Sequence, residues 1–522
     1  MTSVNTEGKT KARYQLLSTG REEYLARGRE VSKLTIPHLL PPLGHTATSR
    51  LPTPYSSLPA RGVNNLASKY TLALFPANTP FFRLTIDDFM LQRLTKKEGM
   101  RAEVEEALNS IERSVMNEIE TSTLRSSITE ALKHLIVVGN SLLYVLPKGG
   151  VRVFRLDRYV VKRDPMGNVL EIIVQEDLSP MELEEEIRNF VLEQSTDSDK
   201  GESPDDSIEL YTHVKRTKTG WSISQEINGK LVPGSEGTYP EDKSPWVPLR
   251  YISAANEDYG RSFGEEYLGD IKSLEALRKA IVQGAAAAAK VLFLVKPNGT
   301  TKAKVLAESE SGDIKEGNKD DVSVLQMDKF ADFRIAQETA KTISEDLSFA
   351  FQLNTAIQRN GERVTAEEIR FMAQELDASQ GGIYSLLGQE LQLPVVRRIM
   401  HQMERSNRLP TLPKGLVKPA ITTGIEAIGR GNDQTKLASL LADLQPLGEA
   451  AFKYLIIPDY IKRQGAAKGI DMKGLIKTPE MIDQEGQQAQ MAAMMQQGLN
   501  PMINQAGGMM KQQLAQEGNP NG

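Results

Sequence analysis

Apolar residues recur at three- and four-residue steps over several long stretches of the chain, a pattern that predicts amphipathic helices. The expected helices cover residues 19–34, 61–76, 100–120, 121–138, 262–290 and 332–354. The apolar stripe of 262–290 is Leu268, Ile271, Leu274, Leu277 and Ile281, with Lys272, Glu275, Lys279 and Gln283 opposite. The stripe of 332–354 is Ala336, Ala340, Ile343, Leu347 and Ala350. Each stripe predicts a helix with one packed face.

Apolar and polar residues alternate between residues 141 and 252, which predicts an antiparallel β region with turns at DPMGN and at Asn228-Gly229. An acidic stretch at 181–207 interrupts it and is expected to be a surface loop. Shorter strands are expected at 81–86, in VLFLVKPNG from residue 291, and in VSVLQM from residue 322. We expect the VLFLV strand to be buried. The fold class is therefore α+β and mainly α-helical.

The segment QRNGERVTAEEI, residues 358–369, places two arginines around an Asn-Gly and then starts a helix. Thr365 and Glu368 have the spacing of a T-x-x-E capping box, which predicts a helix from 366 to about 392. Pro394 should restart or kink that helix, which then runs to 408. A loop held between rigid helices is well placed for a function, although a solvated turn is the alternative from these residues alone.

Composition and charge restrict the classes of function. The chain has 522 residues, enough for two to four compact units, with a net charge of −5. An acidic balance argues against a tight clamp on nucleic acid, because phosphate binding needs a surplus of Lys and Arg. Without cysteine there is no disulfide, thiolate zinc site or thiol nucleophile. We also expect no membrane span, no secretory signal, no metal site among the five scattered histidines, and no cofactor.

Two short motifs suggest chemistry or packing. GRSFG at 260–264 fits G-x-S-x-G, but the nearest expected strand ends near Ile252, whereas a nucleophile elbow needs a strand running directly into Ser262. We therefore expect no catalytic residue and no enzymatic activity, and a serine hydrolase remains an alternative. Near the end of 262–290 lies a run with almost no side chain, in which we single out Gly284, Ala285, Ala287 and Ala289. It predicts close helix packing, including packing between subunits, with a plain helix end as the alternative.

Several long blocks of the sequence carry a resemblance to a known family. They include RGVNNLASKYTLALFP, VVKRDPMGNVLEII, DYGRSFGEEYLGDIKSLEAL, LSFAFQLNTAIQRNGERVTAEEIR, GGIYSLLGQELQLPVVRR and TGIEAIGRG. In this order, over roughly residues 10–475, they resemble portal proteins, the head-to-tail connectors of short-tailed, podovirus-type bacteriophages. The resemblance implies a non-enzymatic ring, typically of twelve copies, at one vertex of the virion capsid. A non-viral helical scaffold protein is the other alternative.

The resemblance also implies partners and an assembly site. The ring would assemble in the host bacterial cytoplasm and nucleate head assembly. Double-stranded DNA would enter and leave through its channel without sequence preference. A terminase large subunit would dock during packaging, and a tail adaptor or tail tube afterwards. Major capsid, scaffolding and internal core proteins are further implied partners, with no membrane involved.

The regions of the portal fold can be mapped onto the chain by the same resemblance. They are a wing at 1–261 and 366–419, stem helices at 262–290 and 332–354, a clip at 291–331, a tunnel loop at 355–365, a crown at 420–475 and a disordered Gln/Met-rich tail at 476–522. The implied channel residues are Gln358, Arg359, Asn360 and Arg363. Lys296, Lys302 and Lys304 are the implied docking residues of the clip, with lysines that merely solubilise a loop as the alternative. In a ring Arg359 and Arg363 would each recur once per subunit, as two basic rings that contact phosphates weakly.

Overall fold

The computed structural model describes residues 9–46, 48–76, 80–86, 100–147, 149–179, 207–288, 292–325, 330–353, 382–410, 417–421 and 439–447, with scattered residues between 185 and 189 and between 455 and 489. The chain divides into two compact units, residues 1–90 with 110–430, and residues 91–109 with 431–522. The described part of the second unit includes the start of α5 (Met100–Thr121) and the short turn η5 (Gln445–Leu447). The elements that matter for function lie in the first unit.

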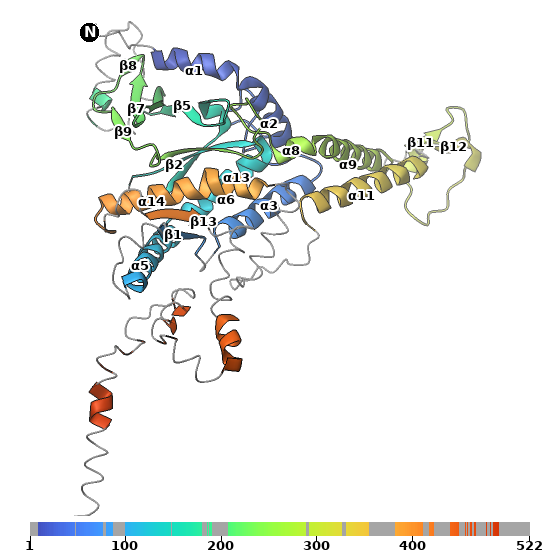
Figure 1. The fold of residues 1–522 in the computed structure, drawn as a ribbon. Helices are drawn as coiled ribbons and strands as arrows, with labels where there is room; N and C mark the ends of the chain where they lie inside the picture. Colours follow the sequence, from blue (N-terminus) through green and yellow to red (C-terminus); the bar gives the residue numbers. More distant parts are fainter. Residues whose placement is uncertain are drawn as a thin grey trace, which may run out of the picture. The chain divides into compact units, whose positions relative to one another are not determined.

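The amino-terminal third is helical, with one helix more than predicted. Its elements are α1 (Lys9–Thr19), α2 (Glu22–Leu34), α3 (Leu58–Leu74), β1 (Phe82–Ile86), α5 and α6 (Leu124–Val138) (Figure 1). The helices predicted at 61–76, 100–120 and 121–138 and the strand at 81–86 are confirmed. The prediction of a first helix at 19–34 missed α1. Its apolar contact with the sheet is short, Tyr14 with Leu17 beside it, and polar contacts surround it.

Those polar contacts join α1 to the larger sheet. Arg13 forms an ion pair with Glu171 at 2.8 Å, and Lys11 pairs with Glu209 at 2.7 Å. The backbone N–H of Thr10 donates to the Glu226 carboxylate at 3.0 Å, which satisfies a free donor in the first turn of the helix. The helix is therefore fixed by the strands that it covers.

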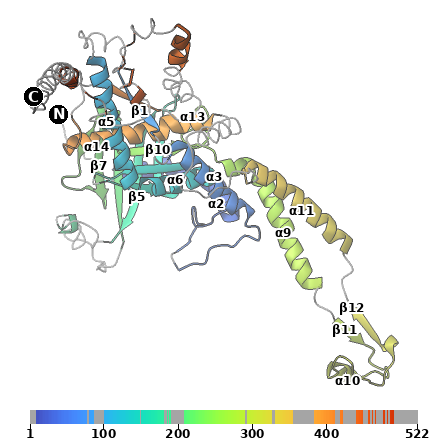
Figure 2. The same cartoon turned by 90° about the horizontal axis from the view of Figure 1, so that it is seen from below.

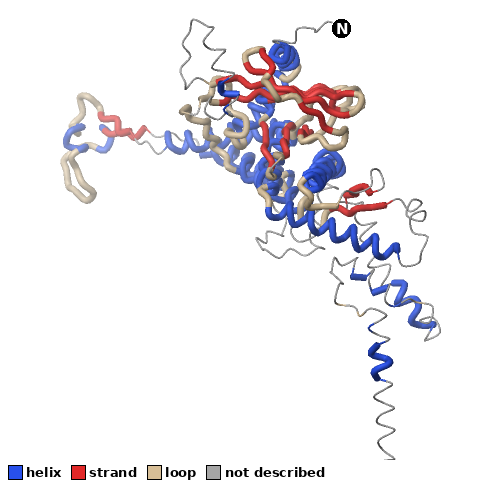
Figure 3. Tube along the Cα trace, turned by 90° about the vertical axis from the view of Figure 1, so that its left-hand side faces the viewer, coloured by secondary structure: helices blue, strands red, loops and turns tan. Residues whose placement is uncertain are grey.

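That larger sheet is six-stranded and antiparallel, in the order β4-β5-β6-β7-β8 with β9 beside β7. Its strands are β4 (Tyr159–Arg163), β5 (Val169–Leu178), β6 (Ile208–Thr217), β7 (Gly220–Ile227), β8 (Lys230–Leu231) and β9 (Gly237–Tyr239), drawn in red in Figure 3. Asn228 and Gly229 both have positive φ, as the predicted Asn-Gly hairpin requires. The acidic interruption at 181–207 lies largely outside the described residues.

A second, three-stranded sheet follows α6 directly. Its order is β10 (Trp246–Arg250), β2 (Asn140–Val145) and β3 (Val151–Phe154), all antiparallel. Gly139 ends α6 with φ +82° and leads into β2. An added Cβ there would come within 2.6 Å of the Arg261 backbone. Only glycine therefore fits this close crossing of two chain segments.

The second half contributes two long helices and a distal hairpin. Its elements are α8 (Phe263–Glu266), α9 (Leu268–Ala288), β11 (Leu292–Val295), α10 (Ala303–Ala307), η3 (Lys319–Asp321), β12 (Val322–Leu325) and α11 (Phe330–Ala350) (Figure 2). The helix predicted at 262–290 is interrupted at Tyr267, where α8 ends and α9 begins. The connection between β11 and β12 contains α10 and η3.

The last part of this unit runs from α13 to β13. It comprises α13 (Ile383–Leu387), a π-helical turn η4 (Gly388–Gln392), α14 (Leu393–Arg405) and β13 (Val417–Ile421), which pairs with β1. Pro394 lies in the first turn of α14, as predicted. The π-turn was not predicted. The capping box of Thr365 and Glu368 lies outside the described residues.

Candidate functional site

The α9 and α11 helices pack side by side as an arm (Figures 1 and 2). Ile271 and Leu274 of α9 are buried, as are Ala340 and Leu347 of α11. These four residues belong to the predicted stripes, so the packed faces are confirmed. The arm is the first part of the candidate site.

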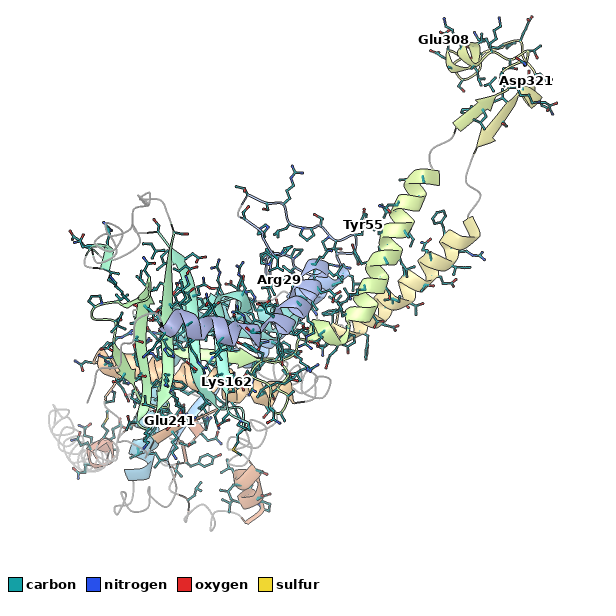
Figure 4. All side chains as sticks on the ribbon, turned by 90° about the horizontal axis from the view of Figure 1, so that it is seen from above. Arg29, Tyr55, Lys162, Glu241, Glu308 and Asp321 are labelled. Carbon is teal, nitrogen blue, oxygen red and sulfur yellow. The ribbon has the colours of Figure 1, made fainter. Side chains whose placement is uncertain are left out.

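The amino-terminal half of α9 is tied to an extended segment of the chain. Glu275 accepts hydrogen bonds from the backbone N–H groups of Tyr55 at 2.7 Å and Ser56 at 2.9 Å. Figure 4 labels Tyr55 beside α9. Glu275 was expected on the polar face, and it is half-buried because its carboxylate holds this segment.

Gly284 marks the closest approach of the two arm helices. A Cβ added at Gly284 would lie 2.2 Å from Cε1 of Phe333, so the Phe333 ring occupies the space that a side chain would need. The close helix packing predicted at Gly284 is present within the chain, and packing of this run between subunits stays a prediction. Ala285 and Ala287 remain exposed, and Ala289 lies outside the described residues.

The outer surface of the arm carries large apolar side chains that the described part of the chain leaves uncovered. Phe349 is 81% exposed, Ile335 63% and Val282 53%. Single exposed apolar residues are ordinary, but three on one helix pair beside exposed alanines form a surface suited to contact with another protein.

The carboxyl end of α11 is anchored on α3. The buried Phe351 ring lies against Gly62, where an added Cβ would come within 2.4 Å of the ring. The Asn65 side-chain amide donates to the backbone carbonyls of Phe351 and Gln352, each at 3.1 Å. Lys69 donates to the same Gln352 carbonyl at 3.1 Å. The chain therefore leaves α11 at a fixed point.

The predicted channel residues follow that point in the sequence. Gln358, Arg359, Asn360 and Arg363 all lie outside the described residues, which end at Leu353 and resume at Gly382. The anchor at Asn65 and Lys69 is the nearest described structure on the amino-terminal side. Sequence reasoning missed this anchor, although Asn65 and Lys69 lie one helical turn apart on α3.

The β11–β12 ribbon, with the loop between its strands, forms the second part of the site. Figure 1 shows both strands beyond the far ends of α9 and α11. Their pairing is antiparallel, with Leu294 opposite Ser323. The prediction of a buried strand is wrong for the single chain, since Phe293 is 61% exposed and Leu294 51%.

Asp321 organises the loop between the strands. Its carboxylate accepts hydrogen bonds from the Thr300 hydroxyl at 3.0 Å and the Thr301 backbone N–H at 3.2 Å. The Thr301 backbone bond, followed by the Thr300 bond, lowers the pKa of Asp321 below its ordinary value. Its backbone carbonyl accepts from Lys296 N–H at 2.9 Å. The loop is thereby closed onto the end of the ribbon (Figure 4 labels Asp321).

The three lysines singled out from the sequence are all exposed in this distal segment. Lys296, Lys302 and Lys304 lie on its surface, and Lys304 approaches Glu308 at 4.0 Å. Between residues 296 and 321 five lysines face six carboxylates. This near balance differs from the basic surplus of a phosphate-binding surface and suits a protein partner with mixed charges.

Ser262 has a structural role. Its hydroxyl accepts a hydrogen bond from the Glu265 backbone N–H at 3.0 Å and caps α8, and the residue is only 3% exposed. The extended peptide before it pairs with Ile252 in an isolated bridge, not a strand. Capping thus explains a serine at this position without a nucleophilic role.

Among the described residues no cluster of His, Asp and Glu is arranged to hold a metal ion. None of the helices in the described ranges is both long and apolar enough to cross a membrane.

Comparison with known proteins gives a consistent result along the chain. Residues 7–476 match the family model described as bacteriophage head to tail connecting protein. The chain is 41% identical over 503 residues to the portal protein of Escherichia phage T7, covering 94% of this chain and 92% of that protein. It is 40% identical over 490 residues to the portal protein of Enterobacteria phage T3, covering 92% and 90%.

A comparison of folds gives a more distant similarity. A chain in the neck of an empty gene transfer agent particle, solved with C6 symmetry, superposes with a TM-score of 0.36 at 10% identity. The superposition covers 73% of this chain and 86% of that chain.

Proposed function

The chain belongs to the bacteriophage head-to-tail connecting proteins, the portal proteins of podovirus-type phages, and on this premise we propose that its copies close into a ring around a DNA channel. The ring of twelve at a capsid vertex, expected from the resemblance, is part of the proposal. So is its role as conduit for genome packaging and ejection and as nucleator of the head.

The observation that carries the ring is the uncovered outer surface of the α9–α11 arm. Val282, Ala285 and Ala287 are exposed on α9, while Ile335 and Phe349 are exposed on α11. Covering such apolar surface is favourable at roughly 25 cal/mol per Å². A second copy of the arm offers the complementary surface without requiring another protein.

Charge supports a contact between unlike faces of the arm. The exposed charges of α9 are Lys272, Arg278 and Lys279 against Asp270, whereas those of α11 are Glu338, Glu345 and Asp346 against Arg334 and Lys341. When α9 of one copy meets α11 of the next, the basic excess of one helix faces the acidic excess of the other. A contact between different surfaces repeats from copy to copy and closes into a ring when the rotation allows.

The channel contact is assigned to the segment that follows the α11 anchor. Arg359 and Arg363, with Gln358 and Asn360, would present a basic lining to DNA. The acidic balance of the whole chain favours sliding, since each neutralised phosphate strengthens binding and slows movement. The anchor of Gln352 on α3 supports this proposal, because it holds one end of the segment on a rigid helix.

The distal segment is the proposed docking surface for the terminase large subunit and then for the tail adaptor. Lys296, Lys302 and Lys304 are exposed there amid carboxylates, so partner surfaces with both charge signs would match it. Residues 1–261 with 366–419 would form the wing, and residues 420–475 the crown.

The ring proposal is tested by placing bulk on the arm surface. Ala287→Trp leaves the single chain folded because Ala287 is exposed, but overpacks the contact between copies and abolishes ring-shaped particles in negative-stain images. Met166→Trp is the matched control, since Met166 is 89% exposed in the β4–β5 turn. Normal rings from Ala287→Trp would contradict this contact surface.

A further inference from the structure

Three strand edges in the body of the first unit, those of β4, β1 and β10, bind side chains through their outward peptide groups. On the outer edge of β4, the Val161 N–H donates to Tyr259 Oη at 3.1 Å and the Arg163 N–H to Asp258 Oδ1 at 2.7 Å. The Glu112 carboxylate accepts from the Leu84 N–H on the outer edge of β1. These contacts satisfy the peptide groups that would otherwise pair with another strand.

The outer edge of β10 is sealed in the same way. The Arg250 N–H donates to Glu390 Oε2 at 3.2 Å, and the Pro248 carbonyl accepts from Arg163 Nη2 at 3.1 Å. Glu390 lies in the π-turn η4, and its ion pair with Arg250 is 2.5 Å long. One edge of the six-stranded sheet, one edge of the three-stranded sheet and one edge of the β1–β13 pair are thus covered by side chains of the same chain.

The β11–β12 ribbon lacks such protection. Hydrogen bonds and ion pairs of the described residues 292–325 all join residues of this same segment. Because Lys296 N–H points inward to the Asp321 carbonyl, alternation of the ladder turns the N–H groups of Phe293 and Val295 outward on β11. The same alternation turns the Val324 N–H outward on β12. Neither the Phe293 nor the Val295 N–H group has a partner in the described part of the chain.

The side chains of the ribbon are as uncovered as its edges. Phe293 and Leu294 are neighbours in one strand, so they point to opposite faces, and both are more than half exposed. A two-stranded ribbon without a covered face is marginally stable in water. Something outside the single chain must therefore cover it.

We propose that β12 of each copy pairs with β11 of the next copy, so that the distal ribbons form one continuous antiparallel sheet around the ring axis. This inference rests on the proposed ring and specifies a contact within it. A rotation about an axis that runs along the strands preserves their direction. Since β11 and β12 are antiparallel within one chain, β12 is also antiparallel to β11 of its neighbour.

A closed sheet of this kind removes every open edge of the ribbon. It supplies partners for Phe293, Val295 and Val324 at once, in a pattern that repeats identically between copies. With two strands from each of twelve copies at about 4.8 Å spacing, the circumference is about 115 Å and the diameter about 37 Å before strand tilt. A B-form duplex fits through such an opening with side chains on its inner face.

The test is hydrogen exchange resolved to single amides, measured on the whole chain before and after ring assembly. The outward amides of Phe293, Val295 and Val324 should exchange quickly in the unassembled chain and at least about tenfold more slowly in rings. The inward amides of Leu294 and Ser323 are the internal control, because they are already paired in the single chain.

A variant distinguishes hydrogen bonding between strand edges from simple shielding of the amides by neighbouring copies. Phe293→Pro removes an outward N–H without removing a bond inside the ribbon, and in rings it should return the Val324 amide of the adjacent copy to rapid exchange. Ile314→Pro, at a loop position that is 99% exposed, should leave that amide protected.

The outcomes distinguish this inference from the ring itself. In one outcome, amides of α9 and α11 exchange more slowly in rings while the three outward amides do not. That result would overturn the edge pairing and leave the ring proposal standing. Protection that appears only after a motor or adaptor protein is added would assign the edge to that partner and overturn pairing between copies. A chain that forms no rings would contradict both proposals.

Discussion

The Phe333 ring of α11 lies over Gly284 of α9, where an added Cβ would come within 2.2 Å of it. This contact sets how closely the two arm helices approach near their far ends. We therefore expect Gly284→Ala to force the helices apart and to lower the free energy of unfolding by about 1–3 kcal/mol, as overpacking does. Denaturant unfolding of the purified chain measures it.

Gly269→Ala is the control for that substitution. Gly269 also lies in α9, but an added Cβ there meets nothing within 4 Å. Its replacement should raise the free energy of unfolding by up to about 1 kcal/mol through helix propensity. Equal effects of the two substitutions would show that Phe333 does not limit the approach.

The Asn65 anchor at the end of α11 can be removed without touching the arm. Asn65→Ala deletes both hydrogen bonds to the Phe351 and Gln352 carbonyls, which should cost about 1–3 kcal/mol of local stability. Hydrogen exchange of residues 347–353 should accelerate accordingly. Asn64→Ala, on the exposed side of the same helix, should leave that exchange unchanged, and a similar acceleration in it would argue against the anchor.

Arg359 and Arg363 carry the proposed contact with DNA. Arg359→Ala combined with Arg363→Ala should leave assembled rings intact, while packaging of DNA or its retention in the head falls. The corresponding double Lys variant keeps both charges and should recover most of the loss, because a sequence-blind phosphate contact depends on charge. Wild-type packaging and retention in the double Ala variant would exclude the role.

Glu112 should make stability depend on pH. Burial is the main cause that raises the pKa of Glu112 to about 7, against the opposing effect of its bond from the Leu84 N–H. The folded state therefore holds a proton that the unfolded state releases above about pH 4.5. The free energy of unfolding should fall as pH rises from about 4.5 to 7, by roughly 3 kcal/mol in total.

Substitution tests that slope directly. Glu112→Gln removes the titrating group and should flatten the decline of unfolding free energy between pH 5 and 8. Glu130→Gln, on the exposed side of α6, should keep the wild-type slope. A slope that survives in Glu112→Gln must come from other groups.

The elements that could be predicted from the sequence are those whose own residues show a helical periodicity or a turn-forming residue type. Ala340 and Leu347 fall on a helical stripe, and both are buried where α11 meets α9. The Asn228-Gly229 turn needs positive φ at both residues, and Asn and Gly are the residue types that adopt positive φ most readily. In such places periodicity or backbone chemistry is local, so no knowledge of distant contacts is needed.

The features that the sequence did not predict depend on contacts with residues far away in the sequence. Helix α1 has only a short apolar stripe, and much of its hold on the sheet comes from ion pairs and hydrogen bonds with Glu171, Glu209 and Glu226. Phe293 belongs to an apolar run that suggested a buried strand, yet nothing in the described chain covers it. Close helix packing was expected at Gly284, but its partner Phe333 could not be identified without knowing that α9 pairs with α11.

The portal assignment also shows what local patterns leave open. GRSFG matches a nucleophile motif, but Ser262 is used to cap α8. Long blocks of family sequence were decisive where short motifs were ambiguous. The channel loop remains a proposal that rests on its position in one of those blocks, and the docking lysines remain a proposal that rests on their position between two of them.

Copies of this chain are proposed to close into a ring by covering the outer surface of the α9–α11 arm. Cryo-electron microscopy of the purified chain under capsid-assembly conditions can show this contact. We predict ring-shaped particles with a central hole in which α9 of one copy packs against α11 of the next and covers Phe349. A chain that stays monomeric, or rings in which Phe349 and Ile335 remain exposed to solvent, would contradict the account.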